Sequence, residues 1–123
     1  MLSGVILNSD ATLNNFQEIG QLQLYRGEEI KLVIKIMNSQ LGIRYVPDVA
    51  AVITIILNNA DGTELEKVAT PLADDRSIIS VDLSETETEG LLSGNIRLKV
   101  VEGTVTKLGV VSDGLGIVTD CAC

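Results

Sequence analysis

The stretch SIISVDLSETETEGLLSGNIRLKVVEG, residues 77–103, decides the fold class that this sequence predicts. Apolar residues recur at every second position at 79, 81 and 83 and again at 96, 98 and 100, which is the period of a half-buried strand. Between these strands, Ser84 and Glu87 have the spacing of a capping box that begins a short helical turn. The charged second face of the later strand, with Arg97 and Lys99, is typical of an antiparallel sheet with one solvated face.

Similar patterns predict further strands, at residues 21–25, 30–37, 49–57, 64–69, 104–111 and 117–119. Turns separate them at residues 26–29 and 58–63, and a Gly-rich turn is expected at 112–116. In total, about eight strands with turns every ~8–12 residues predict an antiparallel β-sandwich. We expect Ile34 and Leu98 to face its core.

The length of 123 residues suggests one domain. We place the β-sandwich domain at residues 21–111, between an N-terminal arm at 1–20 and a C-terminal segment at 112–123. Hydrophobic residues make up 46% of the chain, which is ample for a core, and the low aromatic content of 2% leaves Val, Ile and Leu to build it. The nearly continuous apolar run at 49–57 would need a cover on its second face.

The formal net charge of −8 argues against a nucleic-acid partner, because no basic stripe is present to neutralise phosphates. No apolar run approaches the roughly 18 residues of a membrane helix. The N-terminus MLSGVILNSD lacks the basic region of a signal peptide. We therefore expect a protein that is made in the cytoplasm and does not enter a membrane.

Residue types exclude several kinds of chemistry. The chain has no His, so a Ser-His-Asp triad and any His metal site are excluded. Its carboxylates, such as Asp74, Asp75, Glu85 and Glu89, fall in predicted loops and turns and are interpreted as solvated charge. A loop calcium site stays open, although the EF-hand pattern is absent. We expect no cofactor, no catalytic residue and no enzymatic activity.

Cys121 and Cys123 are the residues with the greatest reactive potential. Their spacing is poor for a disulfide between the two, because the closed loop would be tiny and strained. Two free thiols and an inter-subunit disulfide formed outside the reducing cytosol are the alternatives.

Two apolar segments are candidate contact surfaces. The loop at residues 38–48 is unusually apolar for a solvated loop. The arm holds a short apolar segment that could form an ordinary first strand or pack on a neighbouring subunit. The candidate interface residues are Val5, Ile6, Leu7, Leu41, Ile43, Tyr45 and Val46.

Three signals follow one another along residues 21–111. They are an R-G-[D/E] turn before a long alternating strand, an apolar strand ending in a D-G hairpin, and a D-L-[S/T] segment with later Thr, Leu and Gly. In this chain they are Arg26-Gly27-Glu28, residues 50–62, Val81-Asp82-Leu83-Ser84, Thr88, Leu91, Gly94, Ile96 and Leu98, before a closing hairpin at 105–109. This order, over about three-quarters of the chain, resembles a family of phage virion β-sandwich modules. The family includes the N-terminal domains of upper baseplate proteins and immunoglobulin-like decoration domains of heads and tails.

The resemblance implies an immunoglobulin-like antiparallel β-sandwich with a non-enzymatic, structural role in the virion. We expect a capsid decoration or cement protein, that is, a minor head protein that binds neighbouring capsid subunits and forms a homo-oligomer. A structural protein of the tail or baseplate is the alternative. A carbohydrate- or receptor-binding module is a further one, but sugar sites favour exposed Trp and Tyr, and the chain has only Tyr25 and Tyr45.

Overall fold

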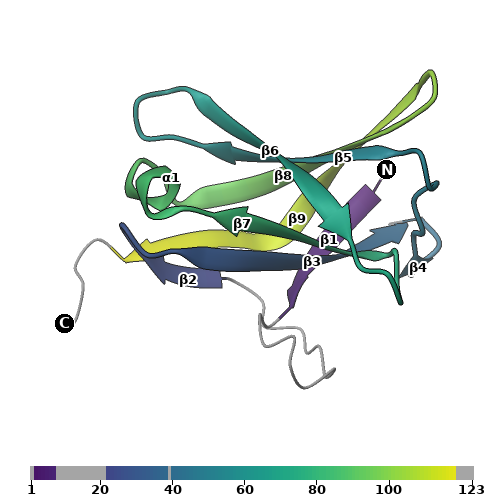
Figure 1. Cartoon of the computed structure of the whole chain (residues 1–123), viewed down its shortest axis with the longest axis horizontal. Coiled ribbons are helices and arrows are strands. Elements are labelled where there is room, and N and C mark those ends of the chain that lie inside the picture. The colour runs from purple at the N-terminus through teal and green to yellow at the C-terminus, as the bar shows by residue number, and fades with distance from the viewer. Residues whose placement is uncertain (1, 8–21, 39, 119–123) are drawn as a thin grey trace.

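A computed structural model describes residues 2–7, 22–38 and 40–118, with the backbone alone for Leu22 and residues 112–118. Figure 1 shows strands throughout these ranges and one short helix. The elements are β1 (Leu2–Leu7), β2 (Leu22–Tyr25), β3 (Ile30–Asn38), β4 (Ile43–Arg44), β5 (Val52–Asn58), β6 (Glu64–Pro71), β7 (Ile78–Leu83), α1 (Glu85–Glu89), β8 (Gly94–Glu102) and β9 (Val105–Val118). The all-β class that the sequence predicts is therefore confirmed.

The expected sandwich is wrong, because the strands close into a ring. Neighbouring strands pair in the order β1-β3-β7-β6-β5-β8-β9, and β9 then pairs with β1. This closure makes a seven-stranded β-barrel in which β2 and β4 are side branches, on β9 and β3 respectively. Closing a sheet removes the open edges that two separate sheets would leave. The pairs around the ring are antiparallel except β1 with β9, which is parallel.

Two glycines make the closing pair possible. A side chain on Gly109 would begin 2.5 Å from the backbone oxygen of Leu2, so only a residue without Cβ lets β9 approach β1. A Cβ on Gly4 would lie 2.9 Å from methyl groups of Ile34 and Val111, which occupy the space it leaves free. The seam between the first and last strands of the ring therefore depends on close packing at these two positions.

Alternate residues of the ring strands face the interior. Ile34 and Leu98 are each 1% exposed, which confirms that both face the core. In β5, Ile53, Ile55 and Leu57 are buried while Val52 is 51% exposed. On the second face of this apolar run, Thr54 is also buried and Ile56 is half-buried, so that face is open mainly at Val52.

Other expectations differ in detail. β1 lies inside residues 1–20, which the sequence placed in an arm, yet it is a strand of the ring. The Gly-rich turn expected at 112–116 is wrong, because β9 continues through it to Val118. The capping box is confirmed: the Glu87 backbone N–H donates to Ser84 Oγ at 3.2 Å, and the Ser84 N–H donates to Glu87 Oε1 at 2.9 Å.

Candidate functional site

Four exposed apolar side chains lie on the segment that joins β3 to β5. Leu41, Ile43, Val46 and Val49 are 68%, 57%, 60% and 81% exposed, and we call them the loop surface. Large apolar side chains that gather on one exposed loop are unusual for a solvated connection and mark contact sites. The loop surface includes three of the interface residues that the sequence suggested.

The backbone beneath the loop surface is held at several points. Asn38 Oδ1 accepts hydrogen bonds from the N–H groups of Gln40 and Leu41, at 3.0 and 3.2 Å. The Tyr45 N–H donates to the Ile36 oxygen at 3.0 Å. These bonds leave the loop a defined shape, so a partner would not have to order it on binding.

Asp75 holds the part of the loop that forms β4. Its carboxylate makes an ion pair with Arg44 and accepts a hydrogen bond from the Ser77 N–H at 3.0 Å. Hydrogen bonding from the Ser77 hydroxyl, helped by the nearby Arg44 charge, lowers the pKa of Asp75 below its ordinary value of 3.8. Arg76 adds a hydrogen bond from its guanidinium to the Asp48 oxygen at 3.1 Å. Asp75 is therefore a structural anchor, which differs from the solvated charge that the sequence suggested.

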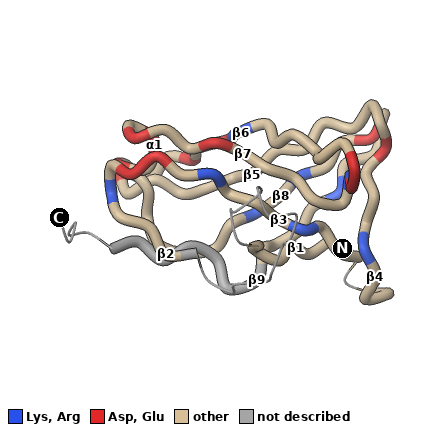
Figure 2. The backbone as a smooth tube through the Cα atoms, turned by 60° about the horizontal axis from the view of Figure 1, so that its bottom comes forward, with Lys and Arg blue, Asp and Glu red and all other residues tan. Residues whose placement is uncertain are grey.

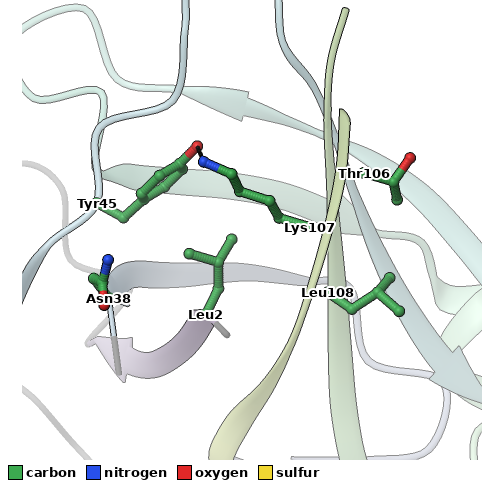
Figure 3. Close-up of a pocket in the computed structure, with 6 residues that line it drawn as sticks. All are labelled: Leu2, Asn38, Tyr45, Thr106, Lys107 and Leu108. Carbon is green, nitrogen blue, oxygen red and sulfur yellow. Dashed lines mark hydrogen bonds between the residues drawn. The ribbon is translucent and has the colours of Figure 1, made fainter. Parts of the chain in front are cut away.

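Tyr45, Glu102 and Lys107 form a cluster that connects the loop to the β8–β9 hairpin. We call these three residues the latch. The Tyr45 hydroxyl donates to Glu102 Oε1, and Lys107 Nζ donates to the Tyr45 hydroxyl oxygen at 2.9 Å. Lys107 also lies 3.3 Å from Glu102 Oε1 and 4.6 Å from the centre of the Tyr45 ring. The Asp48 N–H donates to the second Glu102 oxygen at 2.9 Å. Figure 3 shows Tyr45 and Lys107 pointing toward each other from opposite walls of a hollow.

The protonation of the latch follows from these contacts. Burial and the hydrogen bond to Glu102 raise the pKa of Tyr45, so its hydroxyl stays protonated at neutral pH. The Tyr45 hydroxyl and the Asp48 N–H lower the pKa of Glu102 below its ordinary 4.5. The Tyr45 and Glu102 partners raise the pKa of Lys107. Each group is thus held in its ordinary charge state, and none is prepared to act as a base or nucleophile at neutral pH.

The hollow beside the latch has a volume of about 440 Å³ and is lined by Leu2, Asn38, Tyr45, Thr106, Lys107 and Leu108 (Figure 3). Of its polar lining residues, Tyr45 and Lys107 are hydrogen-bonded to each other in the latch, and Asn38 accepts hydrogen bonds from the loop backbone. Among residues 2–7, 22–38 and 40–118, no three Cys, Asp or Glu side chains are grouped so that they could hold a metal ion.

The other suggested site residues lie elsewhere. Ile6 and Leu7 are 1% and 3% exposed within β1, and Val5 is half-buried, so this segment already packs in its own barrel. Tyr45 is half-buried under Lys107. Cys121 and Cys123 lie outside the described residues.

Sequence reasoning missed two features. Glu102 and Lys107 gave no signal, because they are separated from Tyr45 by 57 and 62 residues and meet it only through the fold. The charged second face of β8 was interpreted as solvated, yet the outer face of the neighbouring strands exposes Val68, Leu108 and Val110. The alternation in β9, which places Leu108 and Val110 opposite the core-facing positions, was the available signal.

Comparison with known proteins gives no family. No family model matches the chain, and no curated protein matches it. Among solved structures, the chain is similar to the M1 domain from titin, with 17% identity, 79% of this chain and 86% of that chain covered, and a TM-score of 0.41. At this level the likeness carries no argument about function. In the described residues, no helix is long and apolar enough to cross a membrane.

Proposed function

We propose that this chain is a non-enzymatic structural protein of a phage particle that binds neighbouring protein subunits through the loop surface. The observation that carries the proposal is the loop surface itself, four large apolar side chains that are 57–81% exposed on a backbone held in place. Burying such side chains against a partner stabilises a complex by about 1.5–3 kcal/mol for each one that is fully covered.

The virion assignment rests on the order of signals along residues 21–111, which resembles phage virion modules. Of the roles that this resemblance implies, we favour that of a capsid decoration or cement protein. A role in the tail or baseplate is the alternative.

The latch argues against the carbohydrate-binding alternative. Sugar rings stack on open faces of Trp or Tyr, and one face of Tyr45 lies under the Lys107 ammonium at 4.6 Å from the ring centre. The Tyr45 hydroxyl is also engaged with Glu102 and Lys107. A sugar would have to displace the latch before it could use this ring.

The loop surface can be tested with Val46→Glu. A charge in the centre of an apolar contact should lower incorporation into particles at least tenfold, or about 1.4 kcal/mol, because the carboxylate would be buried without a partner. Particles made without the wild-type chain would be mixed with each purified variant, sedimented, and the bound chain quantified by immunoblot.

Leu92→Glu is the matched control, because Leu92 is 48% exposed just after α1 and lies outside the loop surface. It should bind particles as the wild type does. Equal binding of Val46→Glu and Leu92→Glu would contradict the role of the loop surface.

A further inference from the structure

A second surface lies on the outer face of the four neighbouring strands β6, β5, β8 and β9. Their registers place outward residues in cross-strand rows: Val68, Thr54, Lys99 and Leu108 form one row, and Glu66, Ile56, Arg97 and Val110 form the next. Val52, Val101 and Thr106 form a third row beside the first. We call these three rows the sheet face.

Much of the sheet face is apolar and open. Val52, Val68, Leu108 and Val110 are 51%, 68%, 59% and 45% exposed. A hollow of about 230 Å³ opens on its β8–β9 side, where Ile56, Leu108 and Val110 contribute to the lining. The exposed apolar side chains lie on β6, β5 and β9, and the charged side chains of Arg97 and Lys99 lie between them on β8. Exposed apolar side chains with charged neighbours are typical of an interaction surface.

The charge of this region differs from that of the rest of the molecule. The chain carries a net charge of −8, and Figure 2 shows acidic residues gathered around α1. The outward charged residues of these four strands are Glu64, Glu66, Arg97 and Lys99, two of each sign. Glu66, Arg97 and Lys99 lie on the sheet face and Glu64 lies at its border, so the described outward side chains of these strands carry no net charge. Two copies of an acidic chain could therefore meet here without strong like-charge repulsion.

The charges of the sheet face are also complementary to one another across a two-fold axis. Arg97 already makes an ion pair with Glu64. Lys99 and Glu66 make no ion pair with any residue in the described part of the chain. They lie on β8 and β6, in adjacent rows.

We propose that the sheet face binds a second copy of this chain in an isologous dimer, with the two-fold axis running along the strands between β5 and β8. In this arrangement β5 lies opposite β8 of the copy, and β6 lies opposite β9. Val68 then faces Leu108 of the copy, which lies in the same row and lines the hollow. Lys99 faces β5 of the copy, next to the strand that carries the copy's Glu66, so two symmetric Lys99–Glu66 pairs form.

The size of the sheet face indicates how stable the proposed dimer should be. Four strands at about 4.8 Å spacing give a width of roughly 19 Å, and about six residues at ~3.3 Å each give a length of roughly 20 Å. Such a contact buries roughly 760 Å² over both copies, which is below the about 1,200–2,000 Å² of stable specific interfaces, so the dimer should be weak, transient and dependent on concentration.

The proposed dimer can be tested by exchanging the charges of Lys99 and Glu66. Sedimentation equilibrium of the wild type at chain concentrations up to about 1 mM should reveal a monomer–dimer equilibrium. Lys99→Glu and Glu66→Lys should each weaken the dimer by about tenfold, because each creates two like-charge contacts across the axis. The double variant Lys99→Glu, Glu66→Lys exchanges both charges and should restore the wild-type dissociation constant.

Leu108→Glu and Leu92→Glu form a matched apolar pair. Leu108→Glu should abolish the dimer, whereas Leu92→Glu should leave it unchanged, and circular dichroism would verify that each variant folds. The proposal stands apart from the loop surface, because Val46→Glu should dimerise as the wild type does. A wild type that stays monomeric to about 1 mM, or a dimer that charge exchange does not restore, would overturn it.

Discussion

At the scale of single residues, several carboxylates hold parts of the fold together through hydrogen bonds and ion pairs. Glu102 accepts hydrogen bonds from Tyr45 and Asp48, Glu87 accepts from Lys67 and closes the capping box, and Asp75 holds β4. These side chains have lowered pKa values because their charged forms are hydrogen-bonded. Sequence alone suggested the Glu87 bond within the box, since Ser84 is three residues away, but the other partners are brought together by strand pairing.

The Glu102 contacts predict a pH dependence of stability. A carboxylate whose pKa is lower in the folded state contributes stability above its unfolded value, ordinarily 4.5, and that contribution is lost as pH falls through the lowered folded value. Glu102→Gln should therefore lower the free energy of unfolding at pH 7 by about 1 kcal/mol and make its fall below pH ~4.5 shallower. Urea unfolding across this pH range would measure both effects.

Glu66→Gln is the control, because Glu66 is exposed on the outer face and makes no ion pair with a described residue. It should change the free energy of unfolding at pH 7 by less than about 0.5 kcal/mol. A Glu102→Gln profile that overlays the wild type would show that the latch does not stabilise the loop.

At the scale of elements, alternation within the sequence predicted most of the strands. The strand expected at 30–37 is β3, and the strands on either side of the capping box are β7 and β8. Local pattern was sufficient there because each strand buries one face. For β1 it suggested a possible short strand but not the partner, since the pairing with β9 joins residues 2–4 to 109–111 and is parallel. Nothing local in either segment encodes such a distant pairing, which is why the closed barrel was mistaken for a sandwich.

Gly109 gives the clearest test of that pairing. In Gly109→Ala, the added methyl group would lie 2.5 Å from the Leu2 oxygen, so β1 and β9 must separate. We expect a loss of about 1–3 kcal/mol in the free energy of unfolding, with faster hydrogen exchange at the amides of residues 2–4. Denaturant unfolding and exchange measured by NMR would report the two effects.

Gly90→Ala provides the comparison. A Cβ at Gly90 would meet its nearest neighbour, Asn59 Oδ1, at an ordinary 3.7 Å, and its φ of −93° suits any residue. Stability close to the wild type is expected for this variant. If both alanine variants behave alike, the close β1–β9 contact is not present in solution.

At the scale of the whole molecule, a closed barrel displays two distinct surfaces. The loop surface lies on the segment between β3 and β5, and the neutral sheet face lies across β6, β5, β8 and β9. Three members of the loop surface, Leu41, Ile43 and Val46, were predictable because they break the polar composition of a loop. The second face of β5 was expected to need a cover, but the rest of the sheet face was not predictable, since it depends on which strands become neighbours.

Both proposals describe a protein that works by binding other protein surfaces, and the particle itself is the place to test this. The most direct measurement is antibody labelling of purified phage particles from the source of the sequence, viewed by electron microscopy. We expect label over the head, as for a decoration protein, whereas label on the tail or baseplate would select the alternative location. Particles that carry no label, while the unassembled chain is labelled by the same antibody, would contradict the virion role.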